Sequence, residues 1–197
     1  MRRRVVLAGA LALAGCGLSE RPYAEKREWP LVVRRPSSRP PARRGKVLLV
    51  RGIGAAPGLG ARGLQSLRPD GSLDIAYYEE WTVPPAESVE SDLRQWLADS
   101  GKFRAVVAPG SRLNADLVLE GTLTAFLANP PAGTARVTLS VVLLDQRPNP
   151  VKILMQRNFT AEERLASADP PAIVQALRAG LADVLRQVED AVGSAAA

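Results

Sequence analysis

Apolar and polar positions alternate along much of this 197-residue chain, and the alternation predicts a sheet-rich protein. The clearest examples are residues 134–145 and 151–159, in which apolar residues recur at every second position over most of the stretch. Between residues 64 and 81, two strand-like runs flank Arg68-Pro69-Asp70-Gly71, whose residue types suit a tight turn, so we expect a hairpin there. Further strands are predicted at residues 29–33, 46–53, 103–108 and 116–127.

Two segments show instead the three-to-four-residue spacing of amphipathic helices. One follows Pro84-Pro85 and ends before Gly101, and the other follows Asp169, a good N-cap, and runs to Val192. The short links between the last three strands favour antiparallel neighbours. The order of elements predicts an α+β fold, a two-layer sandwich of a mainly antiparallel sheet with two amphipathic helices on one face.

The N-terminus has the layout of a secretory signal. Three arginines precede the apolar run Val5–Ala14, which is too short to span a bilayer. The run ends in Leu13-Ala14-Gly15-Cys16, which resembles the bacterial lipobox. That resemblance implies a diacylglyceryl group on the Cys16 sulfur, cleavage before Cys16 and acylation of the new amino terminus, for example with palmitate. The alternative is an ordinary cysteine that follows a cleaved signal.

The resemblance to a lipobox also has consequences for location. Several acyl chains on one cysteine make a stable anchor without a spanning helix. In signals of this kind, aspartate after the cysteine tends to retain the protein in the inner membrane. Here Gly17 occupies that sorting position. We therefore expect attachment to the periplasmic face of the outer membrane of a Gram-negative bacterium.

The net charge of +6 is distributed unevenly. Residues 16–46 carry nine basic and three acidic side chains, whereas residues 47–197 carry fourteen basic and seventeen acidic ones. The basic charge therefore lies near the anchor, which argues against nucleic-acid binding. A basic segment beside a lipid anchor suits either contact with anionic head groups or a solvated, proline-rich linker, and both alternatives stay open.

The residues needed for catalysis or metal binding are scarce. The chain has no histidine, and Cys16 is its only cysteine, so thiol chemistry is excluded if Cys16 is acylated. Five glycines between Gly52 and Gly63 follow a strand but lack the ending of a phosphate-binding loop, and we interpret this segment as a flexible turn. We expect no catalytic residue, no metal site and no cofactor. A periplasmic hydrolase is accordingly the least favoured class.

The richest surface signal is Tyr77-Tyr78-Glu79-Glu80-Trp81. On a regular strand, Tyr77 and Trp81 share one face and Tyr78 lies on the other. Aromatic side chains with a polar tip are favoured at interfaces, but they also pack in cores. Tyr77, Tyr78 and Trp81 are therefore the candidate partner surface, with core packing as the alternative for each of them.

From Trp29 to Val192 the chain resembles the auxiliary lipoproteins of ABC-type transporters that work with MCE-domain lipid-binding proteins. The match is carried by Cys16, the strand at 46–53, the hairpin into Tyr78-Glu79-Glu80-Trp81, the segment Ala115–Gly121 and the last helix. The long glycine-rich segment departs from the common pattern.

The resemblance implies a role and a set of partners. The role is a non-catalytic docking subunit in phospholipid transport, with an MCE-domain protein, a permease and an ATPase on separate chains and possible homo-oligomers. It divides the chain into a lipoprotein signal peptide (1–15), a lipidated tether (16–27), the auxiliary lipoprotein domain (28–193) and a frayed tail (194–197). The alternative function is that of a cell-envelope structural or assembly lipoprotein not tied to transport.

Overall fold

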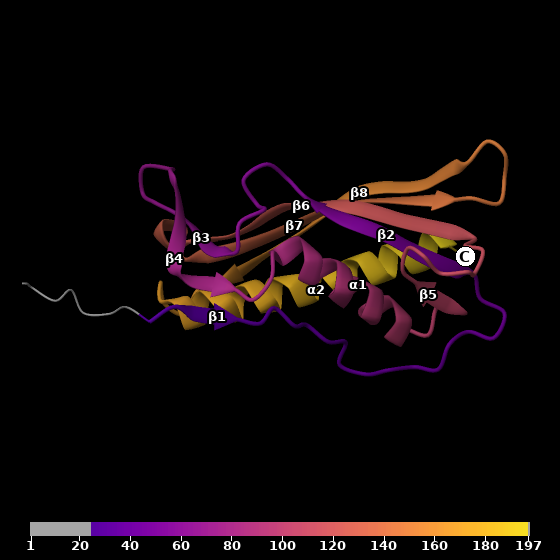
Figure 1. The fold of residues 1–197 in the computed structure, drawn as a ribbon, viewed down its shortest axis with the longest axis horizontal. Helices are drawn as coiled ribbons and strands as arrows, with labels where there is room; N and C mark the ends of the chain where they lie inside the picture. Colours follow the sequence, from indigo (N-terminus) through magenta and orange to yellow (C-terminus); the bar gives the residue numbers. More distant parts are fainter. Residues whose placement is uncertain (1–24, 197) are drawn as a thin grey trace, which may run out of the picture.

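The computed structural model describes residues 25–196, which form one mixed eight-stranded sheet with two helices on one of its faces (Figure 1). The strands are β1 (Arg27–Trp29), β2 (Val47–Ala55), β3 (Gly63–Leu67), β4 (Leu73–Trp81), β5 (Ala105–Val107), β6 (Leu117–Asn129), β7 (Thr134–Asp145) and β8 (Lys152–Arg164). The helices are α1 (Pro85–Asp99), α2 (Pro170–Ala196) and the short 3-10 helix η1 (Pro130–Ala132). The predicted α+β class is confirmed. Cys16, Gly17 and the predicted signal peptide lie outside the described residues.

Strand β6 organises the sheet. One edge of β6 pairs with β7 along its whole length, and β7 pairs with β8, both antiparallel. The other edge is shared, because β2 pairs with Leu117–Leu123 and β3 pairs only at Ala128, both parallel. The sheet therefore divides into two arms, β2–β5 at one end of the molecule and β3–β4–β1 at the other (Figure 1).

The core lies between the sheet and the two helices. The residues of β7 that alternate toward the helices are almost completely buried, as the period of two predicts, and α2 presents a leucine stripe to them. Helix α2 covers β7 and β8, whereas α1 covers β2 and β5. The core residues of β7 and the α2 stripe are Val137, Leu139, Val141, Leu143, Leu177, Leu181 and Leu185.

The segment interpreted as a flexible glycine-rich turn begins later than predicted. Strand β2 continues to Ala55, and Gly52 and Gly54 pair with Glu120 and Thr122 of β6. The ladder shifts register between Val50 and Gly52, and glycine within a strand is typical of such a bulge. Only the second half of the segment forms the connection to β3.

The strand predicted at 29–33 is also shorter. Strand β1 occupies Arg27–Trp29 and so begins inside the segment expected to be tether, and it ends before Pro30, which has no N–H to donate. The chain beyond it still packs against the body, because Leu31 is buried and the Val33 N–H donates to Asp92 Oδ2 at 2.7 Å.

The basic segment 34–46 is bound to the folded body. The Arg39 N–H donates to the Asp99 carbonyl at 2.9 Å, and the Ala42 N–H donates to the Phe103 carbonyl at 3.0 Å. Most of the basic charge that the sequence places near the anchor therefore belongs to the domain. The segment runs from the N-terminal end of α2 toward its C-terminal end (Figure 1).

Helix α2 is longer than predicted. It extends to Ala196, so residues 194–196 are helical where a frayed tail was expected. Lys46 Nζ donates to the Ala196 carbonyl, and Lys102 Nζ donates to the Glu189 carbonyl at 3.1 Å. Lys46 stabilises the last turn of the helix, because it complements the partial negative charge of the carbonyls there, and Lys102 contacts the helix about two turns earlier.

Candidate functional site

The acidic side chains of the aromatic stretch are engaged in the fold. Glu79 accepts a hydrogen bond from Trp29 Nε1 at 2.7 Å and pairs with Arg27 at 2.5 Å. Glu80 lies between Lys26 at 2.8 Å and Arg62 at 2.5 Å. The hydrogen bond from Lys26, followed by the charge of Arg62, lowers the pKa of Glu80. These contacts bind β1 to β4 rather than present a carboxylate to a substrate.

The rest of the described chain offers little other chemistry. Across residues 25–196, no group of three or more acidic, histidine or cysteine side chains is arranged to hold a metal ion. Within the same range, no helix has the length and apolarity needed to cross a membrane.

The structure separates the three aromatic residues of the predicted partner surface. Tyr77 is 75% exposed and Tyr78 is 49% exposed, and their rings meet edge to face with centroids 4.9 Å apart. Trp81 is 1% exposed, and its ring centroid lies 5.5 Å from that of Phe126 in the core. Both tyrosines are therefore exposed, as a partner surface would require, and Trp81 is a core residue.

An irregularity in β4 explains this outcome. Gly63 of β3 pairs with Glu80, whereas Gln65 pairs with Ile75, so a step of two residues in β3 matches a step of five in β4. The extra residues interrupt the alternation of sides on which the sequence prediction relied. Both tyrosines therefore project outward, and Glu80 and Trp81 are both buried.

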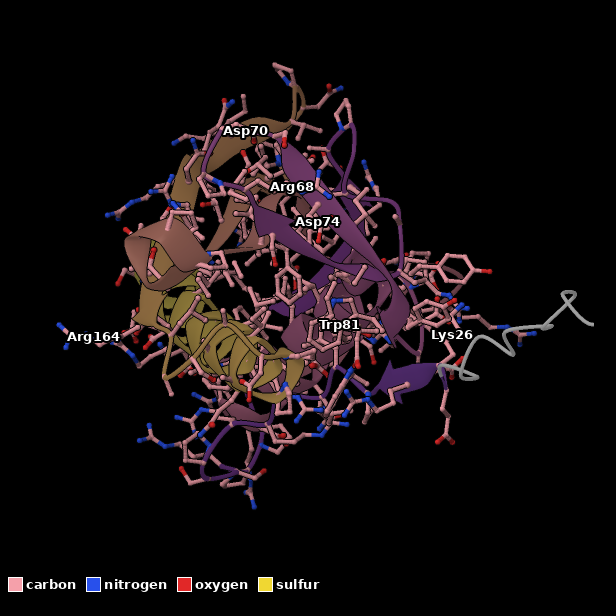
Figure 2. The ribbon with its side chains drawn as sticks, turned by 90° about the vertical axis from the view of Figure 1, so that its left-hand side faces the viewer. Lys26, Arg68, Asp70, Asp74, Trp81 and Arg164 are labelled. Carbon is pink, nitrogen blue, oxygen red and sulfur yellow. The ribbon has the colours of Figure 1, made fainter. Side chains whose placement is uncertain are left out.

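Apolar side chains continue along the same strand. Leu73 and Ile75 are exposed like the two tyrosines, and we call Leu73, Ile75, Tyr77 and Tyr78 the β4 patch. The beginning of the described chain lies against it, because Lys26 Nζ is 5.5 Å from the centroid of the Tyr77 ring. Figure 2 views this end of the molecule, with Lys26 on one flank.

The hairpin beside the β4 patch carries paired charges. Arg68 pairs with Asp74 across the turn, and both lie at the top of the view in Figure 2. Asp70 Oδ1 accepts hydrogen bonds from the Ser72 hydroxyl and backbone N–H, which lower the pKa of Asp70. The turn is therefore held by its own side chains, as its sequence predicts.

The opposite end of the sheet exposes aliphatic residues. Leu113, Val151 and Ile153 are each more than half exposed, and we call them the β7–β8 tip. Their two loops are adjacent, because the Gln146 N–H donates to the Asp116 carbonyl at 2.9 Å. Beside them are the cations Arg112 and Lys152, neither of which forms an ion pair within the part of the chain that the structure describes.

A carboxylate–guanidinium pair fixes the hairpin at the tip. Arg147 Nε and Nη2 donate to the two oxygens of Asp145 at 2.9 and 2.6 Å. The hydrogen bond from the Arg147 side chain, with a second one from its backbone N–H, lowers the pKa of Asp145 to about 2. The exposed aliphatic residues therefore sit on a constrained turn.

A hollow of about 570 Å³ also lies near this end, between the loop around Arg44 and the end of α2. Its cations include Lys46 and Lys102, but both already donate to carbonyls in the last turns of α2. The positions of these two lysines are explained by their contacts with α2, and Arg44 is the third cation that lines the hollow.

Comparisons with known proteins agree with this architecture. Residues 31–189 match the family model described as the ABC-type transport auxiliary lipoprotein component. Among solved structures, protein XCC0632 from Xanthomonas campestris shares 20% identity at a TM-score of 0.70, covering 85% of this chain and 96% of that one. The hypothetical protein CT253 from Chlamydia trachomatis shares 12% identity at a TM-score of 0.54, covering 75% and 98%.

These structural likenesses establish the shared fold alone, and no curated protein matches the sequence. The family model, in contrast, spans most of the chain and includes α1, most of α2 and the whole of the sheet beyond β1. The chain therefore belongs to the family of ABC-type transport auxiliary lipoprotein components.

Proposed function

We propose that this protein is a lipid-anchored, non-catalytic docking subunit of an ABC-type lipid transport system that works with an MCE-domain protein. The observation that carries the proposal is the family match over residues 31–189, together with the lipobox that ends at Cys16. The permease and the ATPase would be separate chains. The protein would be held at the periplasmic face of the outer membrane, where it would receive or hand over phospholipid.

The composition of the chain supports a docking role over a catalytic one. The sequence has no histidine, and acylation would consume its only thiol, so the usual activators of a serine or cysteine nucleophile are missing. The buried carboxylates serve the fold. Asp92, for example, accepts from the Val33 N–H and pairs with Arg34 at 2.8 Å, although its burial raises its pKa.

The protein partner would dock at the β7–β8 tip. Two features support this position. First, α2 alone is 27 residues long, or ~40 Å at ~1.5 Å per residue, and it separates the tip from the end where the described chain begins. Second, the exposed aliphatic residues lie beside Arg112 and Lys152, which form no ion pair within the described residues 25–196, and they suit a partner that presents an apolar surface bordered by acidic side chains.

The test is purification of the tagged, acylated protein from its own cells in a mild detergent, followed by mass spectrometry of the proteins recovered with it. We expect an MCE-domain protein, with or without the permease and the ATPase. We also expect Ile153→Asp to reduce that recovery several-fold. Ile75→Asp is the matched control, because it introduces the same charge at an exposed isoleucine at the other end of the sheet.

Two results would contradict the proposal. Recovery of only peptidoglycan-associated or outer-membrane assembly proteins would favour a structural or assembly lipoprotein. In the second result, Ile75→Asp reduces recovery of the MCE-domain protein and Ile153→Asp leaves it unchanged. The transport role would then stand, but the docking surface would be the β4 patch.

A further inference from the structure

The β4 patch gathers four exposed side chains with apolar surface on one short stretch of strand. Its four side chains fall within six residues of one strand, or ~17 Å at ~3.4 Å per step. Contiguous exposed apolar patches on soluble proteins mark contacts with other proteins, ligands or membranes. Tyrosine combines an apolar ring with a polar hydroxyl, and this combination is enriched where a protein meets the boundary between lipid and water.

The chain that leads to the anchor enters the fold beside this patch. Strand β1 pairs in parallel with β4, Arg27 with Glu79, and Lys26, one residue before β1, lies over the ring of Tyr77. Glu25 lies only nine residue steps beyond Cys16. At ~3.3–3.6 Å per residue they span at most ~30–32 Å, which is less than the length of α2. An acyl chain on Cys16 would therefore keep the patch close to the membrane, at a high effective concentration.

The charges around the patch are mostly engaged in ion pairs. Lys26 pairs with Glu80, Arg27 pairs with Glu79, and Arg68 pairs with Asp74, while the exposed Asp70 and Glu25 add negative charge nearby. Contact with a bilayer would therefore depend on burial of the rings and aliphatic chains and not on attraction between charges. The tip differs, because its exposed cations are unpaired within residues 25–196 and it lies beyond the far end of α2.

We propose that the β4 patch rests in the head-group layer of the membrane that holds the acylated Cys16. Lipid anchor and patch then make two contacts with one bilayer, which gives the domain a fixed orientation with the β7–β8 tip directed away from the lipid. The proposal rests on the acylation of Cys16 that the proposed function includes. It does not depend on the identity of the transported lipid.

The experiment uses the full acylated chain in vesicles of phosphatidylethanolamine and phosphatidylglycerol. Because Cys16 is the only native cysteine and would be acylated, a thiol-reactive fluorophore will label only an introduced cysteine. The reporter is Ile75→Cys, which leaves both tyrosines in place, and the matched control is Ile153→Cys. Both isoleucines are about half exposed, at 47% and 60%, so the fold should tolerate either label.

The proposal predicts a difference between the two reporters. In vesicles that contain head-group-labelled quencher lipids, the probe at residue 75 should be quenched several-fold more strongly than the probe at 153, and its emission should shift to the blue. Adding Tyr77→Ser and Tyr78→Ser to the Ile75→Cys chain should reduce the quenching toward the level at 153. The acyl anchor should still retain that chain on the vesicles.

Equal quenching at residues 75 and 153 would overturn the proposal. If the Ile75→Cys variant folds poorly, Leu73→Cys provides a second reporter on the same patch. Shielding of residue 75 that appears only after a partner protein is added would also overturn it, because the patch would then be a protein interface. The wild-type chain separates these results from failure of the anchor. If the wild-type chain takes up label at Cys16 and leaves the vesicles, Cys16 is not acylated. That result overturns the anchor and, with it, the membrane contact that depends on the anchor.

Discussion

The two ends of the sheet differ in chemistry although β6 connects them. The β4 end exposes tyrosines, carries paired charges and holds the beginning of the described chain. The β7–β8 tip exposes aliphatic residues beside cations without an ion-pair partner in residues 25–196, and Asp145 and Arg147 constrain its turn. An anchored protein that docks a second protein needs two such surfaces, one for each contact.

The face of the sheet that the helices leave uncovered also differs in polarity between its two ends. Toward the β4 end, Thr138 lies opposite Thr160, and their hydroxyl oxygens are 3.0 Å apart. Toward the tip, Leu144 lies opposite Ile153 on the same face. The face therefore changes from polar to apolar along two strands, which means that the apolar tip is a local feature and not part of the core.

The largest expected effect is that of Cys16→Ser, which removes the anchor and leaves both ends of the folded domain unchanged. Membrane retention and lipid transport should be lost, because the proposed attachment is through Cys16. Cell fractionation and a transport assay measure the result, and circular dichroism should show an unchanged fold. Ser19→Ala, three residues further along, is the control. Unchanged retention and transport in Cys16→Ser would contradict the anchoring role.

The next comparison concerns Trp81 and Tyr77 on the same strand. Trp81→Ala removes a buried ring that packs on Phe126, so the free energy of unfolding should fall by ~3–5 kcal/mol. Tyr77→Ala removes an exposed ring and should change it by less than ~0.5 kcal/mol. Urea unfolding of the two variants measures both. Similar losses would mean that Tyr77 is structural and would weaken its assignment to a contact surface.

A third prediction concerns the contact between segment 34–46 and the helices, which connects the two ends. Glu189 is buried and accepts from Trp96 Nε1 at 2.8 Å and from Arg35 Nε at 3.0 Å. Glu189→Ala leaves the mostly buried Arg35 without this partner, and we expect a loss of ~3 kcal/mol in the free energy of unfolding. The neighbouring, exposed Asp190→Ala should cost much less. Equal costs for the two variants would argue against this role of Glu189.

The smallest effect concerns acid stability at the tip. Because the folded pKa of Asp145, about 2, lies below its ordinary value near 3.8, its pair with Arg147 contributes stability above ~pH 4. That contribution is lost as the pH falls through the folded pKa. Asp145→Asn should therefore be less stable than the wild type above ~pH 4, with the difference closing toward pH 2. Urea midpoints over this range measure it, and a difference independent of pH would contradict the assignment.

Local pattern predicted most of the fold. The alternation in β7 and the spacing in α2 identify buried residues such as Leu139 and Leu181, because each signal depends only on neighbours in the sequence. The hairpin at Arg68–Gly71 was predicted for the same reason, since its turn is stabilised by its own residues. The α+β class follows from the order of these elements.

The rest depends on contacts between residues far apart in the sequence. Whether Tyr78 or Trp81 would be exposed was decided by the bulged pairing of β4 with β3, which no local pattern reveals. The basic segment 34–46 resembles a linker in composition, but Asp99 and Glu189 bind it to the body. The lipobox at Cys16, in contrast, is a sequence signal that the described residues do not include.

The most direct test of the two-ended account is photocrosslinking in living cells, with the same crosslinking amino acid placed at residue 78 or at residue 153 of the acylated protein. We predict that the crosslinker at residue 153 forms an adduct with an MCE-domain protein and that the crosslinker at residue 78 forms adducts with phospholipid. Protein adducts from residue 78 combined with none from residue 153 would contradict it, because the docking surface would then lie at the end assigned to the membrane.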